Sequence, residues 1–493
     1  MIDVQVQVII PVHNAATTIV DAVDSAMTQI VPQHLSSMLS DYSIRSFICC
    51  YNDGSTDSSL DLLEELQKRY NNDQSESVDV TKIPAELLIE SGEPARGAGF
   101  ARNQAVKLLN KKNNPSNELE HQFLCLLDSD DIMHPHRIAE QLSFMLGLDV
   151  ESRGKALVGC NFDRIPPDST WHYASWANNL TDERLMLERY REVTILQPTW
   201  MMCKSRWLEL GGEIEVASSN QSVKDIISRY TKESPFCLIH PDDTLQTLRL
   251  AEDLRFFHTH LYSDGVLYLH RTRTKEPLVT YRHTGTSQSF KTSRKLLLSL
   301  RAKAFEESVL KKDSLWQTKN DGRFVVWGAG RDGKDFIKAL DPESRKRIYC
   351  FVDVDEKKIG IGFYINRDLD LRVPIVHFSM LARDPLTRHK LQQQWEEGMG
   401  NNEVFGRINK RRPGSEQNNK TENENSQKSP KKKKRKINNR KADSSVASDS
   451  VDAGLLPQLP VVVCVAMYRT NGVLEDNVKS IGREEGVDLW HFS

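Results

Sequence analysis

The sequence lacks the cysteine patterns that mark zinc sites and disulfide-stabilised domains. Its 493 residues include eight cysteines, and no two of them stand in a CxxC spacing. Five lie inside apolar runs that are typical of buried strands: Cys49, Cys50, Cys125, Cys350 and Cys464. Buried free thiols are typical of proteins in a reducing compartment, so we expect neither a structural zinc site nor a disulfide framework.

Long hydrophobic runs and an excess of charge of one sign are also missing. No apolar stretch approaches the length of a membrane span, and the N-terminus starts with a strand-like segment instead of a basic leader. The net charge of −2 gives no global sign of a nucleic-acid or membrane partner. We therefore expect a cytoplasmic protein with no membrane partner. The basic run 431–436 leaves nuclear entry open, and the oligomeric state is not indicated.

The first 131 residues alternate between strand-like and helix-like patterns. Valines alternate with glutamines before Pro11, which is expected to end the first strand, and Asn14 is expected to cap the helix that follows. Three further strand-like runs give the order β-α-β-α-β-α-β. This order predicts a mostly parallel, doubly wound α/β sheet, and the chain length implies two or three domains.

Three carboxylates, Asp128, Asp130 and Asp131, follow directly after the apolar run 123–127. In parallel sheets, ligands bind beyond the carboxyl ends of the strands. Asp128 and Asp130 are two residues apart, so an extended backbone would direct both side chains the same way, and oxygen ligands suit a hard divalent cation. The alternative is an acidic turn that caps the next helix.

Four segments of this region, each beside a predicted strand, together resemble the family 2 glycosyltransferases of GT-A fold: PVHN at 11–14, NDGSTD at 52–57, ARGAGFARN at 95–103 and LDSDD at 127–131. The resemblance implies a UDP-sugar donor and a Mn²⁺ or Mg²⁺ ion on its diphosphate. It implies Asp128, Asp130 and His283 as metal ligands. The nucleotide-sugar-binding residues that it implies are Pro11, Val12, His13, Asn14, Asp53, Arg96, Arg102, Asn103, Asp128 and Ser129.

The same resemblance places the catalytic base at Asp253, the second acid of the pair Glu252–Asp253. An acceptor hydroxyl must lose its proton as it attacks the anomeric carbon, and a carboxylate can accept that proton. Adjacent carboxylates can raise one pKa toward neutrality. An exposed acidic helix start is the alternative for Asp253. A structural histidine is the alternative for His283, and His270 competes for the same role.

The chain changes character after the predicted catalytic domain at 1–290. A linker helix is expected at 291–320, followed by Gly328, Gly330 and Gly333 in a GxGxxG spacing between a strand and a helix. Together with Asp353 at the end of the next strand, this spacing is formally a dinucleotide-binding fingerprint. The unit is too short for a complete dinucleotide-binding domain, so we favour a docking role.

This second unit is predicted at 321–395 and 457–493 as a small Rossmann-like α/β domain. Residues 396–456 between its parts are rich in Asn, Ser, Lys and Glu, which predicts a disordered basic insertion. The basic run inside the insertion is typical of a nuclear-localisation or RNA-contacting patch, and a solvated loop is the alternative.

The combination of the two domains, with WGAG at 327–330, FVDVDE at 351–356 and the terminal WHFS, resembles the queuosine-tRNA galactosyltransferases within the family. That resemblance implies transfer of galactose from UDP-galactose to queuosine in a tRNA anticodon. Two alternatives remain: an N-acetylglucosaminyltransferase that acts on a protein or glycan, and a non-catalytic RNA- or protein-binding module.

Overall fold

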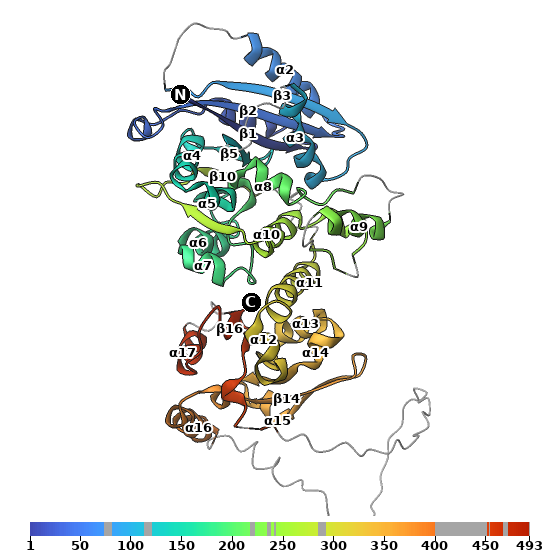
Figure 1. Cartoon of the computed structure of the whole chain (residues 1–493). Helices are drawn as coiled ribbons and strands as arrows, with labels where there is room; N and C mark the ends of the chain where they lie inside the picture. Colours follow the sequence, from blue (N-terminus) through green and yellow to red (C-terminus); the bar gives the residue numbers. More distant parts are fainter. Residues whose placement is uncertain are drawn as a thin grey trace, which may run out of the picture.

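The chain forms two α/β units that follow one another along the molecule (Figure 1). The first contains a seven-stranded and a three-stranded sheet, and the second contains a six-stranded sheet. This architecture confirms the predicted α/β fold class with its second, smaller α/β unit. The computed structural model describes residues 1–72, 81–112, 121–216, 222–233, 238–240, 243–283, 292–399, 451–452, 454–466 and 472–492.

The large sheet has the strand order β3-β2-β1-β4-β8-β6-β9. The first four strands in this order, β3, β2, β1 and β4, are parallel to one another. Strand β8 runs antiparallel to both β4 and β6. The strands are β1 (Ile2–Val12), β2 (Tyr42–Asp53), β3 (Ala85–Gly92), β4 (Gln122–Leu126), β6 (Ala156–Cys160), β8 (Met201–Cys203) and β9 (Val266–His270). Because β1, β2 and β4 are parallel, the loops at their carboxyl ends meet at one edge of the sheet.

Helices cover both faces of this sheet, which explains why Ile9 and Ile10 of β1 are both completely buried. Those of the first unit are α1 (Ile19–Met27), α2 (Ser59–Asn72), α3 (Ala98–Lys112), α4 (Arg137–Gly147), α5 (Val150–Gly154), α6 (Trp171–Asn179), α7 (Asp182–Leu187), α8 (Lys204–Glu209), α9 (Val223–Glu233) and α10 (Glu252–Tyr262).

Two local predictions at the first loop are wrong. Strand β1 does not end at Pro11 but continues to Val12, which lies opposite Asn52 of β2. Asn14 does not cap α1, because the residue before that helix is Thr18. Asn14 instead has a left-handed backbone (φ 51°) and accepts a 2.8 Å hydrogen bond from the Thr56 amide. The loop after β1 is therefore tied to the loop after β2.

The three-stranded sheet lies over the carboxyl edge of the large one. It has the order β5-β10-β7, with β5 (Ile132–Met133), β10 (Val279–Arg282) and β7 (Phe162–Ile165). Strand β5 follows the acid segment 128–131 directly, and the Arg282 amide donates a 2.8 Å hydrogen bond to Oδ1 of Asp131. The small sheet therefore forms a wall beside the acids.

The second unit follows α11 (Arg294–Phe305) and α12 (Ser314–Thr318), which lie in the predicted linker. Its strand order is β13-β14-β12-β11-β15-β16. The strands are β11 (Phe324–Trp327), β12 (Ile348–Asp353), β13 (Phe363–Asn366), β14 (Leu371–His377), β15 (Val461–Val463) and β16 (Leu489–His491). The helices are α13 (Arg331–Ala339), α14 (Pro342–Lys346), α15 (Glu356–Ile361), α16 (Pro385–Met399) and α17 (Val473–Ser480).

The predicted insertion at 396–456 includes residues that belong to the folded second unit at both of its ends. Residues 396–399 belong to α16, and Leu456 is completely buried in the core of the second unit. The central part, 400–450 with the basic run, lies outside the described residues. Strand β15 follows it and pairs in parallel with β11, and β16 pairs in parallel with β15, so the chain returns to the same sheet.

The end of the chain joins the two units. Trp490 of β16 packs its ring against Tyr190 of the first unit at 5.3 Å between centroids, and Phe305 of α11 packs against Tyr190 at 5.1 Å. Arg184 also forms an ion pair with Glu485 across the same junction. Buried aromatic contacts of this kind contribute strongly to packing. The second unit therefore packs against the first through these side chains.

The described cysteines are buried free thiols, as their apolar surroundings predict. All seven described cysteines are free and buried: Cys49, Cys50, Cys125, Cys160, Cys203, Cys350 and Cys464. Among the described residues, none of the helices has the length and apolar character that crossing a bilayer requires.

The glycines of the GxGxxG segment have packing roles. A Cβ atom on Gly333 would lie 2.0 Å from the Gly328 carbonyl oxygen, so glycine lets α13 approach β11. The carboxylate of Asp353 accepts hydrogen bonds from the Ala329 amide (2.8 Å) and from Lys358 (2.9 Å). The acid that would hold a ribose in a dinucleotide-binding domain is thus bound to the protein itself.

We expect Gly333→Ala to destabilise the second unit by about 1–3 kcal/mol, because the added methyl group forces helix and strand apart. Gly330→Ala is the matched control, since a Cβ atom there meets no atom within 4 Å. Urea denaturation of both variants would measure the difference, and equal stabilities would contradict the packing role.

Candidate active site

The three acids after β4 form a compact cluster. Ligand oxygens of Asp128, Asp130 and Asp131 all lie within 4.8 Å of one another. Asp131 is completely buried, and its Oδ2 has no hydrogen-bond partner among the described residues. Burial, followed by the charge of Asp128, raises the pKa of Asp130 to about 6. Mutual repulsion of this kind is expected where carboxylates converge without a cation to balance them.

A divalent cation fits this cluster. Three carboxylates supply the hard oxygen ligands that Mg²⁺ and Mn²⁺ prefer, and the buried, unpartnered Oδ2 of Asp131 is an atom that a positive group would satisfy. The predicted pair Asp128 and Asp130 is brought together, and Asp131 joins it as a third acid. His283 is not part of this group among the described residues, and its role as a metal ligand stays a prediction.

Arg102 links the acid cluster to a second group of carboxylates. Its guanidinium lies 2.7 Å from Asp128, 3.2 Å from Glu213 and 3.4 Å from Glu252. Only 3% of its side chain is exposed. Burial by itself would lower the pKa of Arg102, but the surrounding acids outweigh burial and raise it. Arg102 is predicted to bind the nucleotide sugar. In the structure it forms ion pairs with all three of these acids.

The predicted base lies beside this network. Asp253 is the second residue of α10, next to Glu252, and its Oδ1 accepts a 2.7 Å hydrogen bond from the Leu254 amide. Burial, followed by the charge of Glu252, raises the pKa of Asp253 to about 7. A carboxylate with a pKa near neutrality is well suited to accept a proton. Asp253 is therefore not an ordinary exposed acid at a helix start.

Asp53 holds the loop that leads into α3. Its Oδ2 accepts hydrogen bonds from the Arg96 amide at 2.8 Å and the Gly97 amide at 2.7 Å. His13 Nδ1 lies 2.8 Å from the Asp53 carbonyl oxygen. A Cβ atom on Gly54 (φ 63°) would lie 2.9 Å from the Ala95 nitrogen, so this turn requires glycine. The structure thus brings together the predicted segments 11–14, 52–57 and 95–103.

The other predicted nucleotide-sugar residues differ in their surroundings. Pro11 and Val12 are buried at the end of β1, and Ser129 is half-buried between the metal-site acids. The guanidinium of Arg96 lies over the Phe100 ring, 4.5 Å from its centroid. None of these contacts tests ligand binding, so the roles of these residues stay predictions.

Asn103 is hydrogen-bonded within the protein, and its predicted role in nucleotide-sugar binding stays a prediction. It is 4% exposed, and its amide nitrogen donates to the Glu213 carbonyl oxygen at 2.7 Å. Its Oδ1 accepts from the Glu213 amide at 3.1 Å and from Trp207 at 3.2 Å. With donor and acceptor both bound to the protein, Asn103 positions Glu213. His270 likewise binds Glu140 at 2.9 Å, so its imidazole is engaged away from the acid cluster.

Glu213 is a site residue that sequence reasoning missed. It is 1% exposed, and Gln197 donates a 2.6 Å hydrogen bond to it on the side opposite Arg102. Burial raises the pKa of Glu213 to about 7. Its segment, LGGEIE at 210–215, shows no strand-end pattern, and only the fold brings it to Arg102. The two glycines before it were the one local signal of a special turn.

The parallel sheet, the helices on both its faces and the acids beyond β4 define a GT-A-type nucleotide-sugar fold. The model of the family "Glycosyl transferase family 2" matches residues 7–211. The part of the chain that this model matches is therefore similar to glycosyltransferase family 2. The match ends before Asp253, which leaves the assignment of the base to the geometry.

Parts of the chain are similar to known proteins. Poly(ribitol-phosphate) beta-glucosyltransferase of Bacillus spizizenii (strain ATCC 23059 / NRRL B-14472 / W23) is 28% identical over 140 residues, which are 28% of this chain and 17% of that protein. Two crystal structures of S. aureus TarS 1-349 are similar at low levels. The complex with UDP has 14% identity and a TM-score of 0.38, and covers 70% of this chain and 83% of that one. The complex with UDP-GlcNAc has 13% identity and a TM-score of 0.37, and covers 71% and 84%.

We expect Asp130→Ala to weaken Mn²⁺ binding by at least about tenfold, because the cluster loses one of its oxygen ligands. Titration calorimetry of the purified protein with Mn²⁺ measures this without an activity assay. Asp61→Ala removes the same charge from an exposed position on α2 and is the control. Unchanged Mn²⁺ affinity in Asp130→Ala would contradict a metal site at the acid cluster.

Proposed function

We propose that this chain is an inverting glycosyltransferase that moves a hexose from a UDP-sugar to a hydroxyl group of its acceptor. The observation that carries the proposal is the position of Arg102. It contacts the metal-site acid Asp128 and also Glu252, the neighbour of the proposed base. Leaving group and acceptor would therefore meet in one site, as a single displacement at the anomeric carbon requires.

Each group of residues has a part in this reaction. When bound at Asp128 and Asp130, a divalent cation neutralises charge on the departing diphosphate. Asp253 takes the proton from the acceptor hydroxyl, because burial and Glu252 raise its pKa to about 7. Arg102 holds Glu252 and Asp128 at fixed positions. The loops that Asp53 ties together, around His13 and Arg96, are proposed to receive the nucleoside.

Two acceptors are considered. The resemblance to queuosine-tRNA galactosyltransferases supports galactose from UDP-galactose and queuosine in the tRNA anticodon. The relative from Bacillus spizizenii is named for a poly(ribitol-phosphate) acceptor, and this match favours the alternative, a UDP-sugar-dependent glycan transferase. Both acceptors carry a chain of phosphates, so both are polyanions.

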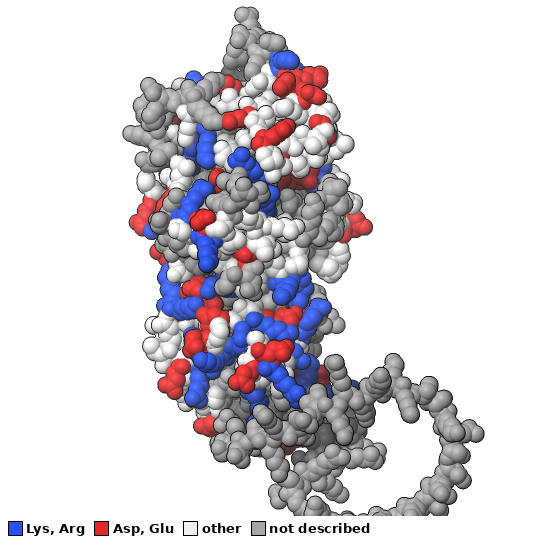
Figure 2. Space-filling model, turned by 90° about the vertical axis from the view of Figure 1, so that its right-hand side faces the viewer, with Lys and Arg blue, Asp and Glu red and all other residues white. Residues whose placement is uncertain are grey.

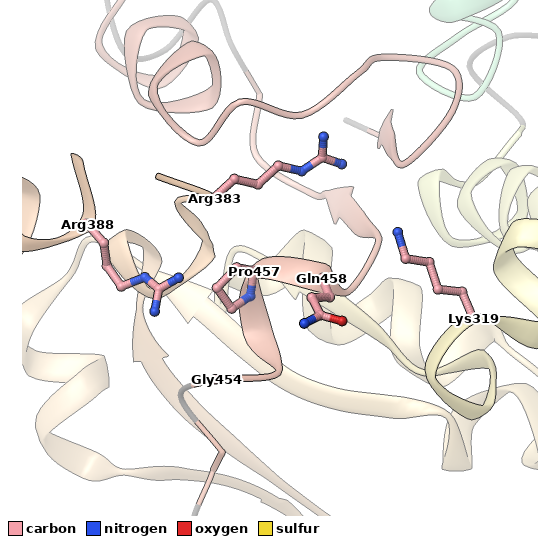
Figure 3. Close-up of a pocket in the computed structure, with 6 residues that line it drawn as sticks. All are labelled: Lys319, Arg383, Arg388, Gly454, Pro457 and Gln458. Carbon is pink, nitrogen blue, oxygen red and sulfur yellow. The ribbon is translucent and has the colours of Figure 1, made fainter. Parts of the chain in front are cut away.

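The second unit carries a cationic hollow that suits a polyanionic acceptor. Lysines and arginines gather over this unit on the face shown in Figure 2. A pocket of about 400 Å³ lies in the second unit, and Figure 3 shows Arg383, which also pairs with Asp488, and Lys319 at it from separate segments. Its lining contains no carboxylate: Lys319, Arg383, Arg388, Gly454, Pro457 and Gln458. Lys and Arg groups of this kind bind phosphates in a salt-dependent way.

A nucleotide-sugar panel tests the proposed function. UDP-galactose, UDP-N-acetylglucosamine and UDP-glucose are each incubated with the protein and either total tRNA or a poly(ribitol-phosphate) polymer. Mass spectrometry of the tRNA nucleosides and of the polymer units reports the transferred sugar. Galactosylated queuosine would establish the tRNA acceptor, and a modified polymer would establish the glycan acceptor. Absence of UDP binding by the protein would overturn the proposal as a whole.

We expect Asp253→Asn to lower kcat by roughly 10²–10⁴-fold while UDP binding is retained, because the variant is nearly isosteric but accepts no proton. In the unmodified protein, kcat/KM should rise with pH up to about 7, since the base works only when it is deprotonated and its pKa lies there. The variant should lose this dependence.

Glu252→Gln is the control for this prediction, since Glu252 adjusts the charge of its neighbour and does not take the proton. It should be less damaging than Asp253→Asn. Near-normal turnover of Asp253→Asn, or greater damage in Glu252→Gln, would move the base to another residue, with Asp131 as the next one to test.

A further inference from the structure

Strand β7 carries a charged residue at an inward position. Its four residues alternate between buried and exposed, so Phe162 and Arg164 point inward while Asp163 and Ile165 point outward. Arg164 is only 9% exposed. An arginine on the buried face of a strand breaks the usual pattern of apolar residues inside, and such breaks are expected at functional sites.

Aromatic rings enclose this arginine without neutralising it. The centre of its guanidinium lies 4.6 Å from the ring centroid of Tyr281, 5.4 Å from Phe162 and 5.6 Å from Tyr173. Among the described residues, no carboxylate forms an ion pair with Arg164, and its Nε is buried without a hydrogen-bond partner. Burial lowers the pKa of the Arg164 guanidinium. A buried cation without an anion is costly to maintain.

The enclosing tyrosines place Arg164 between the two halves of the active site. Tyr281 lies directly opposite Arg164 in the pairing of β10 with β7. The next residue of β10, Arg282, holds Asp131 through its backbone amide. Strand β10 therefore connects Arg164 with the side of the acid cluster.

The second tyrosine, Tyr173, belongs to α6 and is influenced by the charge of the proposed base. Burial, followed by the charges of Glu192 and Asp253, raises the pKa of Tyr173. Its hydroxyl donates a 2.9 Å hydrogen bond to the Val193 carbonyl oxygen, which fixes the ring. Arg164 is therefore enclosed by Tyr281, next to the residue that binds Asp131, and by Tyr173, on whose pKa the charge of Asp253 acts.

We propose that Arg164 recognises a phosphate group of a substrate at the junction of donor and acceptor. This inference rests on the proposed function. The phosphate would be either the diphosphate of the UDP-sugar or a phosphate of the polyanionic acceptor. In both cases, the guanidinium, which forms no ion pair with a carboxylate among the described residues, gains an anion. The N–H groups of an arginine guanidinium are arranged so that two of them can donate to two phosphate oxygens. The aromatic rings around Arg164 hold the guanidinium in position.

A purely structural role accounts less well for the same contacts. A guanidinium that served only to fill space between rings would be replaced without cost by methionine, which has a similar length and no charge. Arg137, a completely buried arginine of α4, differs in this respect, because it donates to Gln141 at 2.8 Å and to the Leu126 carbonyl oxygen at 2.9 Å. Arg164 has no such bonds among the described residues.

The experiment compares Arg164→Met with the unmodified protein by titration calorimetry in the presence of Mn²⁺. The probes are UDP, uridine and inorganic phosphate, and phosphate is titrated both alone and after saturation with UDP. Asp163→Asn, on the exposed face of the same strand, is the matched control. Thermal unfolding of both variants shows whether the fold is retained, and Arg164→Lys shows whether a positive charge alone restores binding.

If Arg164 takes the donor diphosphate, Arg164→Met should bind UDP about tenfold or more weakly and uridine normally, as expected for loss of a charge-assisted hydrogen bond. If it takes an acceptor phosphate, UDP affinity is unchanged, and the variant loses the phosphate that binds to the UDP-saturated protein. Arg164→Lys should restore part of either loss.

Equal affinities of Arg164→Met and the unmodified protein for UDP and for phosphate would overturn the inference. Equal losses of UDP affinity and uridine affinity in Arg164→Met would also overturn it, because that pattern reflects a general distortion of the site. Failure of the unmodified protein itself to bind UDP would instead count against the proposed function, so the two failures are distinguishable.

Discussion

One buried arginine holds the candidate active site together. Arg102 contacts Asp128, Glu213 and Glu252, which come from the segment after β4, the loop after α8 and the start of α10. Without this cation the three acids would repel one another across a space that water enters poorly. Breaking a buried ion pair on one side typically costs about 3–5 kcal/mol. The network therefore fixes the position of the acid cluster relative to Glu252, the neighbour of Asp253.

The rest of the fold brings these segments to the arginine. The parallel order of β1, β2 and β4 places their loops at one edge of the large sheet. Asp53 then ties the loop before α3 to the end of β2, which determines where α3 and its Arg102 begin. The small sheet supplies the opposite wall, since the amide of Arg282 binds Asp131. The second unit braces this arrangement through Trp490 and Tyr190.

The same physical reasoning separates the two nucleotide-binding patterns of the chain. In the first unit the acids after β4 have atoms without protein partners, such as Oδ2 of Asp131, and so can accept a ligand. In the second unit Asp353 is bound to Ala329 and Lys358, and Gly333 is needed for close packing of a helix on a strand. A similar sequence pattern thus serves packing in the second unit, because its polar groups are already satisfied.

The sequence by itself determined the α/β class, the acid pair Asp128 and Asp130, and the free buried cysteines, because these follow from local patterns of apolar runs and strand ends. It could not determine which polar residues near the site serve a ligand and which serve the protein. Asn103 and Arg102 are neighbours in one motif, yet one positions Glu213 and the other joins three acids. Glu213 and Arg164 come from segments without a motif and reach the site only through long-range packing. Their roles depend on burial and on partners far away in the chain, and only the tertiary structure sets these.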